Sequence, residues 1–140
     1  MRRSTDLMQL LTRAERLLAR RLTAILAAEG HGLEAWRVIT LLADGRGHPM
    51  TEVAEHAFLP PGSLTRLVDH LVEDALLYRR VDDADRRRIL AYLSPRGRRL
   101  HQRIADEIQA SLTGLPAATE LERNLVTLID GLDAVKSPGA

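Results

Sequence analysis

The chain of 140 residues contains no cysteine, only one lysine and very few aromatic side chains: one Trp, two Tyr and one Phe. The lack of cysteine excludes disulfides, thiolate zinc sites and cysteine-based redox sensing, and indicates a reducing compartment. The few aromatic rings leave no stacking platform for RNA. No run of about 18 apolar residues is present, and residues 1–22 are charged and amphipathic, unlike a signal peptide. We therefore expect one cytoplasmic domain spanning residues 1–140, with no membrane contact.

Positive charge is concentrated in one segment of the chain. The net charge is only +1, yet residues 79–103 contain nine arginines and three aspartates, so this segment carries +6 and the remainder about −5. Codon bias would explain the preference for arginine over lysine, but it does not explain the clustering. Such an asymmetry is typical of a nucleic-acid-binding surface.

Apolar residues recur at helical spacing along most of the chain. The pattern predicts six helices, over about residues 5–29, 33–45, 51–59, 62–76, 95–112 and 121–135. Thr51 is the expected N-cap of the third helix. Ser94 and Pro95 stand at the expected N-cap and first position of the fifth helix, which is a strong start signal.

A hairpin is predicted between the fourth and fifth helices. Residues 76–81 and 89–93 alternate as strands do, and residues 82–88 join them. This order of elements predicts a mostly α fold that contains a winged helix-turn-helix over residues 33–94, with the small antiparallel β-hairpin as its wing. The flanking segments, residues 5–30 and 95–136, carry apolar stripes too broad for a small central region to cover. They are therefore predicted to be the dimerisation helices of a homodimer.

The wing segment DRRRILAYLSPRG resembles the signature of the MarR family of transcription regulators at five positions: Asp85, Arg87, Leu93, Ser94 and Gly97. The segments GSLTRLVDHL and LEAWRVITLLAD are similar to the family's recognition helix and second helix. The resemblance covers residues 33–97 and implies a homodimer that binds a pseudo-palindromic operator in double-stranded DNA. It further implies a repressor that a small aromatic or phenolic effector releases, and no cofactor is expected.

Four side chains on the polar face of the predicted recognition helix are candidate DNA contacts: Ser63, Thr65, Arg66 and His70. The resemblance puts base reading at Arg66, whose guanidinium can bond O6 and N7 of a guanine. The alternatives are a phosphate contact or a pair with Asp69 or Glu73. The two hydroxyls suit a phosphate or a base edge, and the histidine suits the DNA backbone. Pro60 stands where the family has a Ser or Thr cap, so this helix is expected to begin without a side-chain cap.

The predicted wing loop contains three adjacent arginines, Arg86, Arg87 and Arg88, which are all candidate DNA contacts. Neighbouring guanidinium groups repel one another, so Asp85 is predicted to brace Arg87. Arg86 then remains to enter the narrow minor groove, where the negative potential is enhanced, and Arg88 to contact a phosphate. Asp82 and Asp83 are interpreted as turn formers. The alternative is a solvated run of charges.

The effector pocket that the resemblance implies lies between the first, second and fifth helices. Its candidate residues are Arg20, His31, Trp36 and Arg37, although the position of Trp36 on a buried helix favours a core residue over a ligand contact. None of the five histidines forms an i, i+4 histidine pair or neighbours a cysteine or a carboxylate cluster, so no metal site is predicted.

Two functions from different classes fit these patterns. The first is a DNA-binding transcription regulator, and the second is a winged-helix module that binds an acidic protein partner through the same arginines. The pattern contains no nucleophile with a base, no phosphate-binding glycine loop and no catalytic pair of carboxylates. The chain is therefore not expected to be an enzyme.

Overall fold

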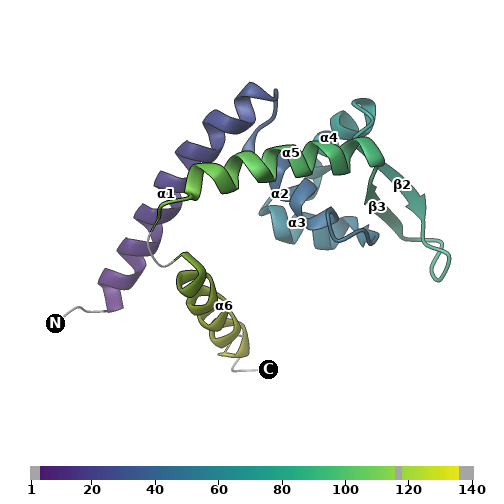
Figure 1. Cartoon of the computed structure of the whole chain (residues 1–140). Helices are drawn as coiled ribbons and strands as arrows, with labels where there is room; N and C mark the ends of the chain where they lie inside the picture. The colour runs from purple at the N-terminus through teal and green to yellow at the C-terminus, as the bar shows by residue number, and fades with distance from the viewer. Residues whose placement is uncertain (1–3, 116–117, 136–140) are drawn as a thin grey trace. The chain divides into compact units, whose positions relative to one another are not determined.

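The computed structural model describes residues 4–115 and 118–135, in two compact units that comprise residues 1–108 and 109–140 (Figure 1). The described ranges contain six helices: α1 (Ser4–Ala28), α2 (Leu33–Leu42), α3 (Met50–Ala57), α4 (Pro61–Glu73), α5 (Pro95–Leu112) and α6 (Ala118–Val135). The predicted mostly α fold with six helices is confirmed. Residues 116, 117 and 136 of the predicted dimerisation segment lie outside the described residues.

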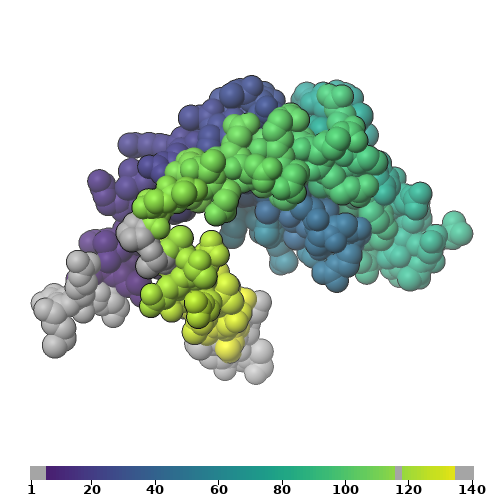
Figure 2. Space-filling model, in the orientation of Figure 1, coloured from purple at the N-terminus to yellow at the C-terminus, as the bar shows by residue number. Residues whose placement is uncertain are grey.

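The wing belongs to a small antiparallel sheet of three strands in the order β1-β3-β2. Strands β2 (Leu77–Val81) and β3 (Ile89–Leu93) pair residue for residue, so the loop comprises residues 82–88 as predicted. The hairpin projects from the rest of the first unit in Figure 2. Strand β1 (His48–Pro49) was not predicted, because two residues show no alternation; it pairs with β3 and joins the wing to the α2–α3 connection.

The core of the first unit lies where α1 to α5 and the sheet meet. Its largest fully buried side chains are Leu26, Val38, Ile39, Leu42, Val53, Leu64, Val68 and Ile104. On α4 the buried residues are Leu64, Val68 and Leu71, at i, i+4 and i+7, and so this helix packs with the face that its sequence pattern predicts.

Several helix boundaries differ from the sequence prediction: α2 ends at Leu42 instead of near residue 45, α6 begins at Ala118 instead of near residue 121, and the start of α3 and the end of α4 also differ. Helix α3 begins at Met50 with Pro49 as its N-cap and no side-chain cap, so the prediction that Thr51 caps this helix is wrong. The reason is that Pro49 is still extended, with φ −61° and ψ 148°, because it ends strand β1. Helix α4 ends at Glu73 instead of near residue 76, because Ala75 adopts a left-handed turn at φ 60° before β2.

The predicted start of α5 is confirmed and connects the wing to this helix. The Ser94 hydroxyl accepts a hydrogen bond from the Gly97 amide at 3.0 Å and lies 2.9 Å from the Leu76 carbonyl oxygen, to which it can donate. Gly97 packs so tightly that an added Cβ would collide with the Leu76 carbonyl oxygen and the Leu93 side chain. Helix α5 therefore begins in direct contact with Leu93 of β3 and with Leu76, the residue before β2.

Helices α1 and α6 each expose large apolar side chains. On α1 these are Leu7, Met8, Leu10, Leu17 and Leu18, and on α6 they are Leu121, Val126, Ile129 and Leu132. Neither helix, nor any other in the described ranges, is long and apolar enough to cross a membrane. Each of these two helices therefore carries exposed apolar side chains together with charged residues.

Candidate nucleic-acid interface

The exposed face of α4 presents Arg66 to solvent. Within the described residues its guanidinium has neither an ion-pair partner nor a hydrogen-bond partner. The two carboxylates that could have paired with it are engaged elsewhere: Asp69 accepts a hydrogen bond from Arg79 of β2, and Glu73 lies 4.0 Å from the ring of His70. The structure therefore leaves Arg66 available for a ligand.

The first turn of α4 has no side-chain cap, as its sequence predicts. Pro60 is the N-cap and Pro61 the first helical residue. Thr65 donates its hydroxyl hydrogen to the Pro61 carbonyl at 3.0 Å, while Ser63 is half-buried. Backbone amides at an uncapped helix start favour anions such as phosphate. This end of the helix thus combines uncapped amides with an exposed arginine one turn further on.

The wing loop pairs some of its arginines internally. Asp85 Oδ1 accepts hydrogen bonds from the backbone amide and from Nε of Arg87, at 3.1 and 3.2 Å. These bonds hold the pKa of the Asp85 carboxyl below its ordinary value. Arg88 lies 3.6 Å from Asp82, a pairing that was not predicted. Arg86, by contrast, is exposed and has no such partner among the residues that the structure describes.

The wing is attached to α4 and stiffened by contacts that the sequence did not reveal. The ion pair of Arg79 with Asp69 joins β2 to α4. Tyr78 and Tyr92 face each other across the hairpin with their rings stacked at 5.1 Å, and the Arg80 guanidinium lies 5.7 Å from the Tyr78 ring centre. Cross-strand aromatic pairs and cation–π contacts stabilise a hairpin. Arg66 and Arg86 are consequently carried by two elements that are fixed to each other.

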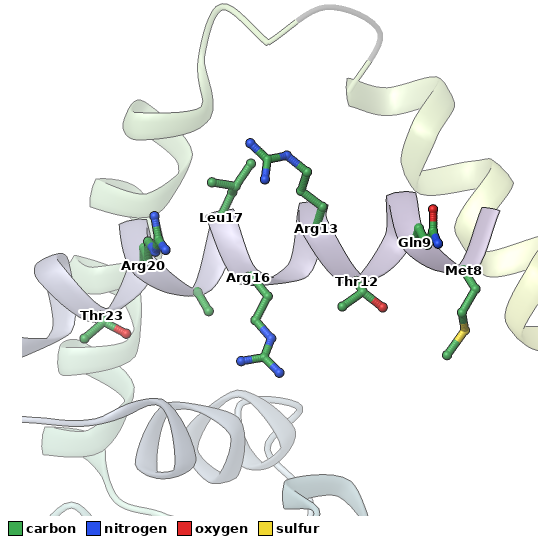
Figure 3. A pocket seen from close by; sticks show the side chains of 9 residues that line it. Met8, Gln9, Thr12, Arg13, Arg16, Leu17, Arg20 and Thr23 are labelled. Atoms are coloured by element: carbon green, nitrogen blue, oxygen red, sulfur yellow. The ribbon is translucent and has the colours of Figure 1, made fainter. Parts of the chain in front are cut away.

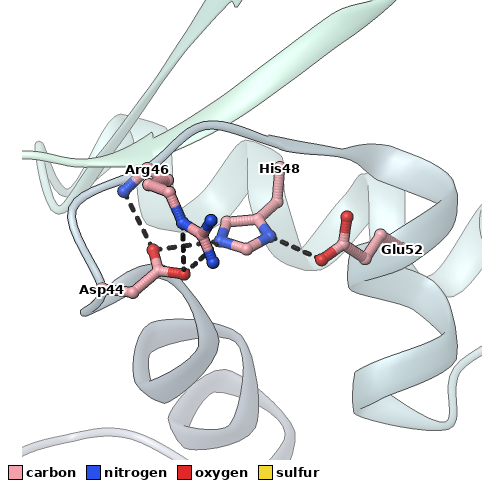
Figure 4. A network of polar contacts seen from close by, with 4 residues as sticks. All are labelled: Asp44, Arg46, His48 and Glu52. Atoms are coloured by element: carbon pink, nitrogen blue, oxygen red, sulfur yellow. Dashed lines mark hydrogen bonds and ion pairs between the residues drawn. The ribbon is translucent and has the colours of Figure 1, made fainter.

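A buried histidine holds together the connection between α2 and α3 (Figure 4). His48 is 5% exposed, and its two ring nitrogens lie 2.7 Å from Glu52 Oε1 and 2.9 Å from Asp44 Oδ2. Burial alone would lower the pKa of His48, but the bonds to the two carboxylates raise it above its ordinary value. The spacing of Asp44, His48 and Glu52, four residues apart each time, is the signal that could have revealed this network. In the described ranges no group of acidic, histidine or cysteine side chains has the arrangement of a metal site.

Residues 30–88 match the model of the MarR family, and this range contains α2, α3, α4, β2 and the wing loop described above. Residues 30–88 are a MarR-family winged-helix region. The resemblance seen in its wing and recognition-helix segments is thereby confirmed. No curated protein matches the chain.

Solved structures of MarR-family regulators resemble the whole fold. A transcriptional regulator from Silicibacter pomeroyi is 26% identical, with 94% of this chain and 90% of that chain covered and a TM-score of 0.75. CouR from Rhodococcus jostii RHA1, bound to p-coumaroyl-CoA, is 25% identical over 98% of this chain and 96% of that chain, with a TM-score of 0.75. NadR in complex with 4-hydroxyphenylacetate is 23% identical, covers 98% and 95%, and has a TM-score of 0.79.

The four residues expected to line an effector pocket have different surroundings in the part of the chain that the structure describes. Arg20 lies on a groove along α1 together with Leu17 and other residues of that helix (Figure 3). Trp36 stacks on His101 of α5 with ring centres 5.2 Å apart, and burial lowers the pKa of His101. Arg37 lies 3.9 Å from Glu15, and His31 lines a cleft with Arg96, Arg99 and Arg103. Their role in effector binding stays a prediction.

Proposed function

We propose that this protein is a MarR-family transcription regulator that binds an operator in double-stranded DNA, and not an enzyme. The observation that carries the proposal is the pair of unengaged arginines, Arg66 on α4 and Arg86 on the wing, on elements that the ion pair of Asp69 with Arg79 joins. A guanidinium on a recognition helix can read guanine in the major groove, and one on a loop suits a narrow minor groove. Contacting both grooves at once requires that α4 and the wing keep a fixed separation. The ion pair of Asp69 with Arg79 supports this requirement.

We infer that Ser63, Thr65, His70, Arg87 and Arg88 make the remaining DNA contacts. The exposed or half-buried position of each side chain supports this role. Because two of these arginines are paired with carboxylates, they are expected to contact phosphates and to position the wing more than to read bases. Asp85 would act by holding Arg87 in place.

The regulator is proposed to act as a homodimer on a pseudo-palindromic operator. The large apolar side chains exposed on α1 and on α6 support this, since exposed apolar patches mark surfaces that meet a partner, and a twofold copy is the commonest partner. A twofold protein places two recognition helices about one DNA turn apart, which requires an operator with matching half-sites.

An effector that relieves repression completes the proposal. NadR and CouR, which this chain resembles in fold, are bound to 4-hydroxyphenylacetate and p-coumaroyl-CoA. We infer a small aromatic or phenolic effector for this chain as well, with Arg20, His31, Trp36 and Arg37 as the first residues to test. A thermal-shift screen of phenolic acids measures binding directly, because a ligand that binds only the folded chain raises Tm.

The decisive experiment is selection of binding sequences from a random pool of double-stranded DNA with the full chain. We expect enrichment of one pseudo-palindromic sequence. Affinity for that sequence should fall steeply with salt, with a slope of about −0.9 in log K against log salt for each phosphate contacted. Failure to enrich any sequence contradicts the proposal and favours the acidic protein partner, which would bind through the same arginines.

A further inference from the structure

The only phenylalanine of the chain occupies an unusual place, at the turn between α3 and α4. Phe58 is 85% exposed, and its backbone is left-handed with φ 56°. A left-handed backbone is unfavourable for a residue with a large side chain, and glycine is the usual occupant of this position after a helix. An exposed ring adds little to the core. Neither the backbone nor the packing therefore explains why a phenylalanine stands here.

The turn holds Phe58 in a fixed position beside the start of α4. The Phe58 amide donates to the Glu55 carbonyl at 3.3 Å, and the Leu59 amide donates to the Ala54 carbonyl at 3.1 Å. Pro60 and Pro61 follow, and their rings restrict the backbone that leads into α4. The Phe58 ring thus projects from a rigid turn just before the start of α4, the helix that carries Arg66.

We propose that Phe58 reads DNA, with its ring packed against a thymine methyl group beside the bases that α4 faces. This inference rests on the proposed function and extends its contact surface across the α3–α4 turn. The thymine methyl is the apolar group that a base pair offers in the major groove, and phenylalanine is one of the side chains that contact it. Residues held in a strained backbone often belong to a ligand-binding surface.

The charge around Phe58 favours a base over the DNA backbone as its contact. The shallow groove that Phe58 lines also contains the exposed carboxylate of Glu55, together with Thr51, Ala54 and Pro61. A carboxylate repels phosphates, whereas in the major groove it can accept a hydrogen bond from a cytosine amino group. An apolar ring next to an acceptor thus suits the base edges better than the phosphates.

The test compares Phe58→Gly with Ala75→Gly. In the described ranges Phe58 and Ala75 are the two residues other than glycine with positive φ, at 56° and 60°, and they lie at opposite ends of α4. Glycine relieves the backbone at both positions, so both variants should unfold at or above the wild-type Tm. Only Phe58→Gly should lose operator affinity. Phe58→Asn, which tolerates the left-handed backbone and lacks the ring, should lose affinity in the same way.

Replacing each operator thymine by deoxyuridine, which lacks the methyl group, locates the contact. At one thymine in each half-site the wild-type chain should lose about fourfold in affinity, the value for one buried methyl-sized group. Phe58→Gly should be insensitive to deoxyuridine at that position, while Ala75→Gly should respond as the wild type does. The inference is wrong if Phe58→Gly binds as the wild type does, or if its deoxyuridine profile equals that of the wild type. If the wild-type chain enriches no DNA sequence, the proposed function itself fails and this inference fails with it.

Discussion

At the scale of single residues, the arginines of the interface differ in whether a carboxylate holds them. Arg79, Arg87 and Arg88 each have one, whereas Arg66 and Arg86 have none among the described residues. An arginine held by a carboxylate fixes the shape of the protein and contributes less to binding. The two remaining arginines are thus the ones whose loss should alter DNA binding most directly.

Arg66→Ala and Arg86→Ala should affect DNA binding in different ways. Loss of Arg66 should relax the base preference at one position in each half-site, at a cost of about 1–3 kcal/mol for the preferred base. Loss of Arg86 should weaken binding to all sequences and reduce the salt slope by about one unit, or shift the preference toward sequences with a wider minor groove. Binding-site selection and salt titrations with both variants measure these effects. Identical sequence preferences for wild type and Arg66→Ala would contradict the role given to Arg66.

His48 should make the stability of the chain depend on pH. Because the bonds to Asp44 and Glu52 raise its pKa above 6.5, its protonated form stabilises the fold, most fully below about pH 6.5. This stabilisation should disappear as the pH rises through the raised pKa. Urea unfolding from pH 5 to 9 of wild type and His48→Gln should therefore show a difference that is largest at low pH, on the order of 1–3 kcal/mol.

The matched control for this pH series is His101→Gln. Burial lowers the pKa of His101, so its contribution to stability is lost as the pH falls through 6.5, in the opposite direction. Arg46, whose amide donates to Asp44, is the charged neighbour of the His48 network. A difference between wild type and His48→Gln that does not change with pH would show that the pKa of His48 is the same in the folded and the unfolded chain.

At the scale of elements, the start of α5 connects the wing to the rest of the first unit. The Ser94 cap and the absence of a side chain at Gly97 allow α5 to lie directly against β3 and against the residue that precedes β2. A change at this junction should alter the position of the wing, and therefore the position of Arg86, without touching the loop itself.

Gly97→Ala should destabilise the chain and weaken DNA binding. The new Cβ would collide with the Leu76 carbonyl oxygen, a backbone atom that cannot move aside without shifting β2. Overpacking of this kind costs about 1–3 kcal/mol. Gly131→Ala in α6, where a Cβ meets no atom, is the control and should stabilise by up to about 1 kcal/mol. Thermal unfolding and operator titrations measure both variants, and equal Tm values for wild type and Gly97→Ala would contradict the expected collision.

Local contacts of these elements were predictable from sequence, and distant ones were not. Neighbouring residues determine the helical periodicity, the Ser94 cap and the hairpin loop. They also determine the contact of Asp85 with Arg87, two residues away. The pairs of Asp69 with Arg79 and of Glu29 with Arg103 join residues 10 and 74 positions apart. Such pairs depend on how the helices and strands pack. The cavity around an effector depends on packing in the same way, so the effector candidates could not be placed together from sequence alone.

At the scale of the whole molecule, the proposed dimer should determine operator affinity. Each subunit of the dimer provides one recognition helix and one wing, which together bind one half-site. Because the two subunits are linked, binding of the second half-site is an intramolecular step. The exposed apolar faces of α1 and α6 are the surfaces through which we expect this link to form. Disrupting them should weaken operator binding even though no DNA contact is changed.

Leu132→Glu on α6 tests this coupling. Leu132 is 64% exposed in the single chain, so a charge there should leave the folded chain intact but should disrupt an apolar interface by burying an unpaired carboxylate. A penalty of about 3 kcal/mol raises the dimer Kd about a hundredfold, and operator affinity should fall with it.

Thr127→Glu adds the same charge at an exposed position on the opposite side of the same helix, and should remain dimeric and bind as the wild type does. Sedimentation analysis and operator titration measure both variants. A Leu132→Glu variant that stays dimeric would remove α6 from the interface, and one that is monomeric with wild-type affinity would show that the operator is recognised by a single chain.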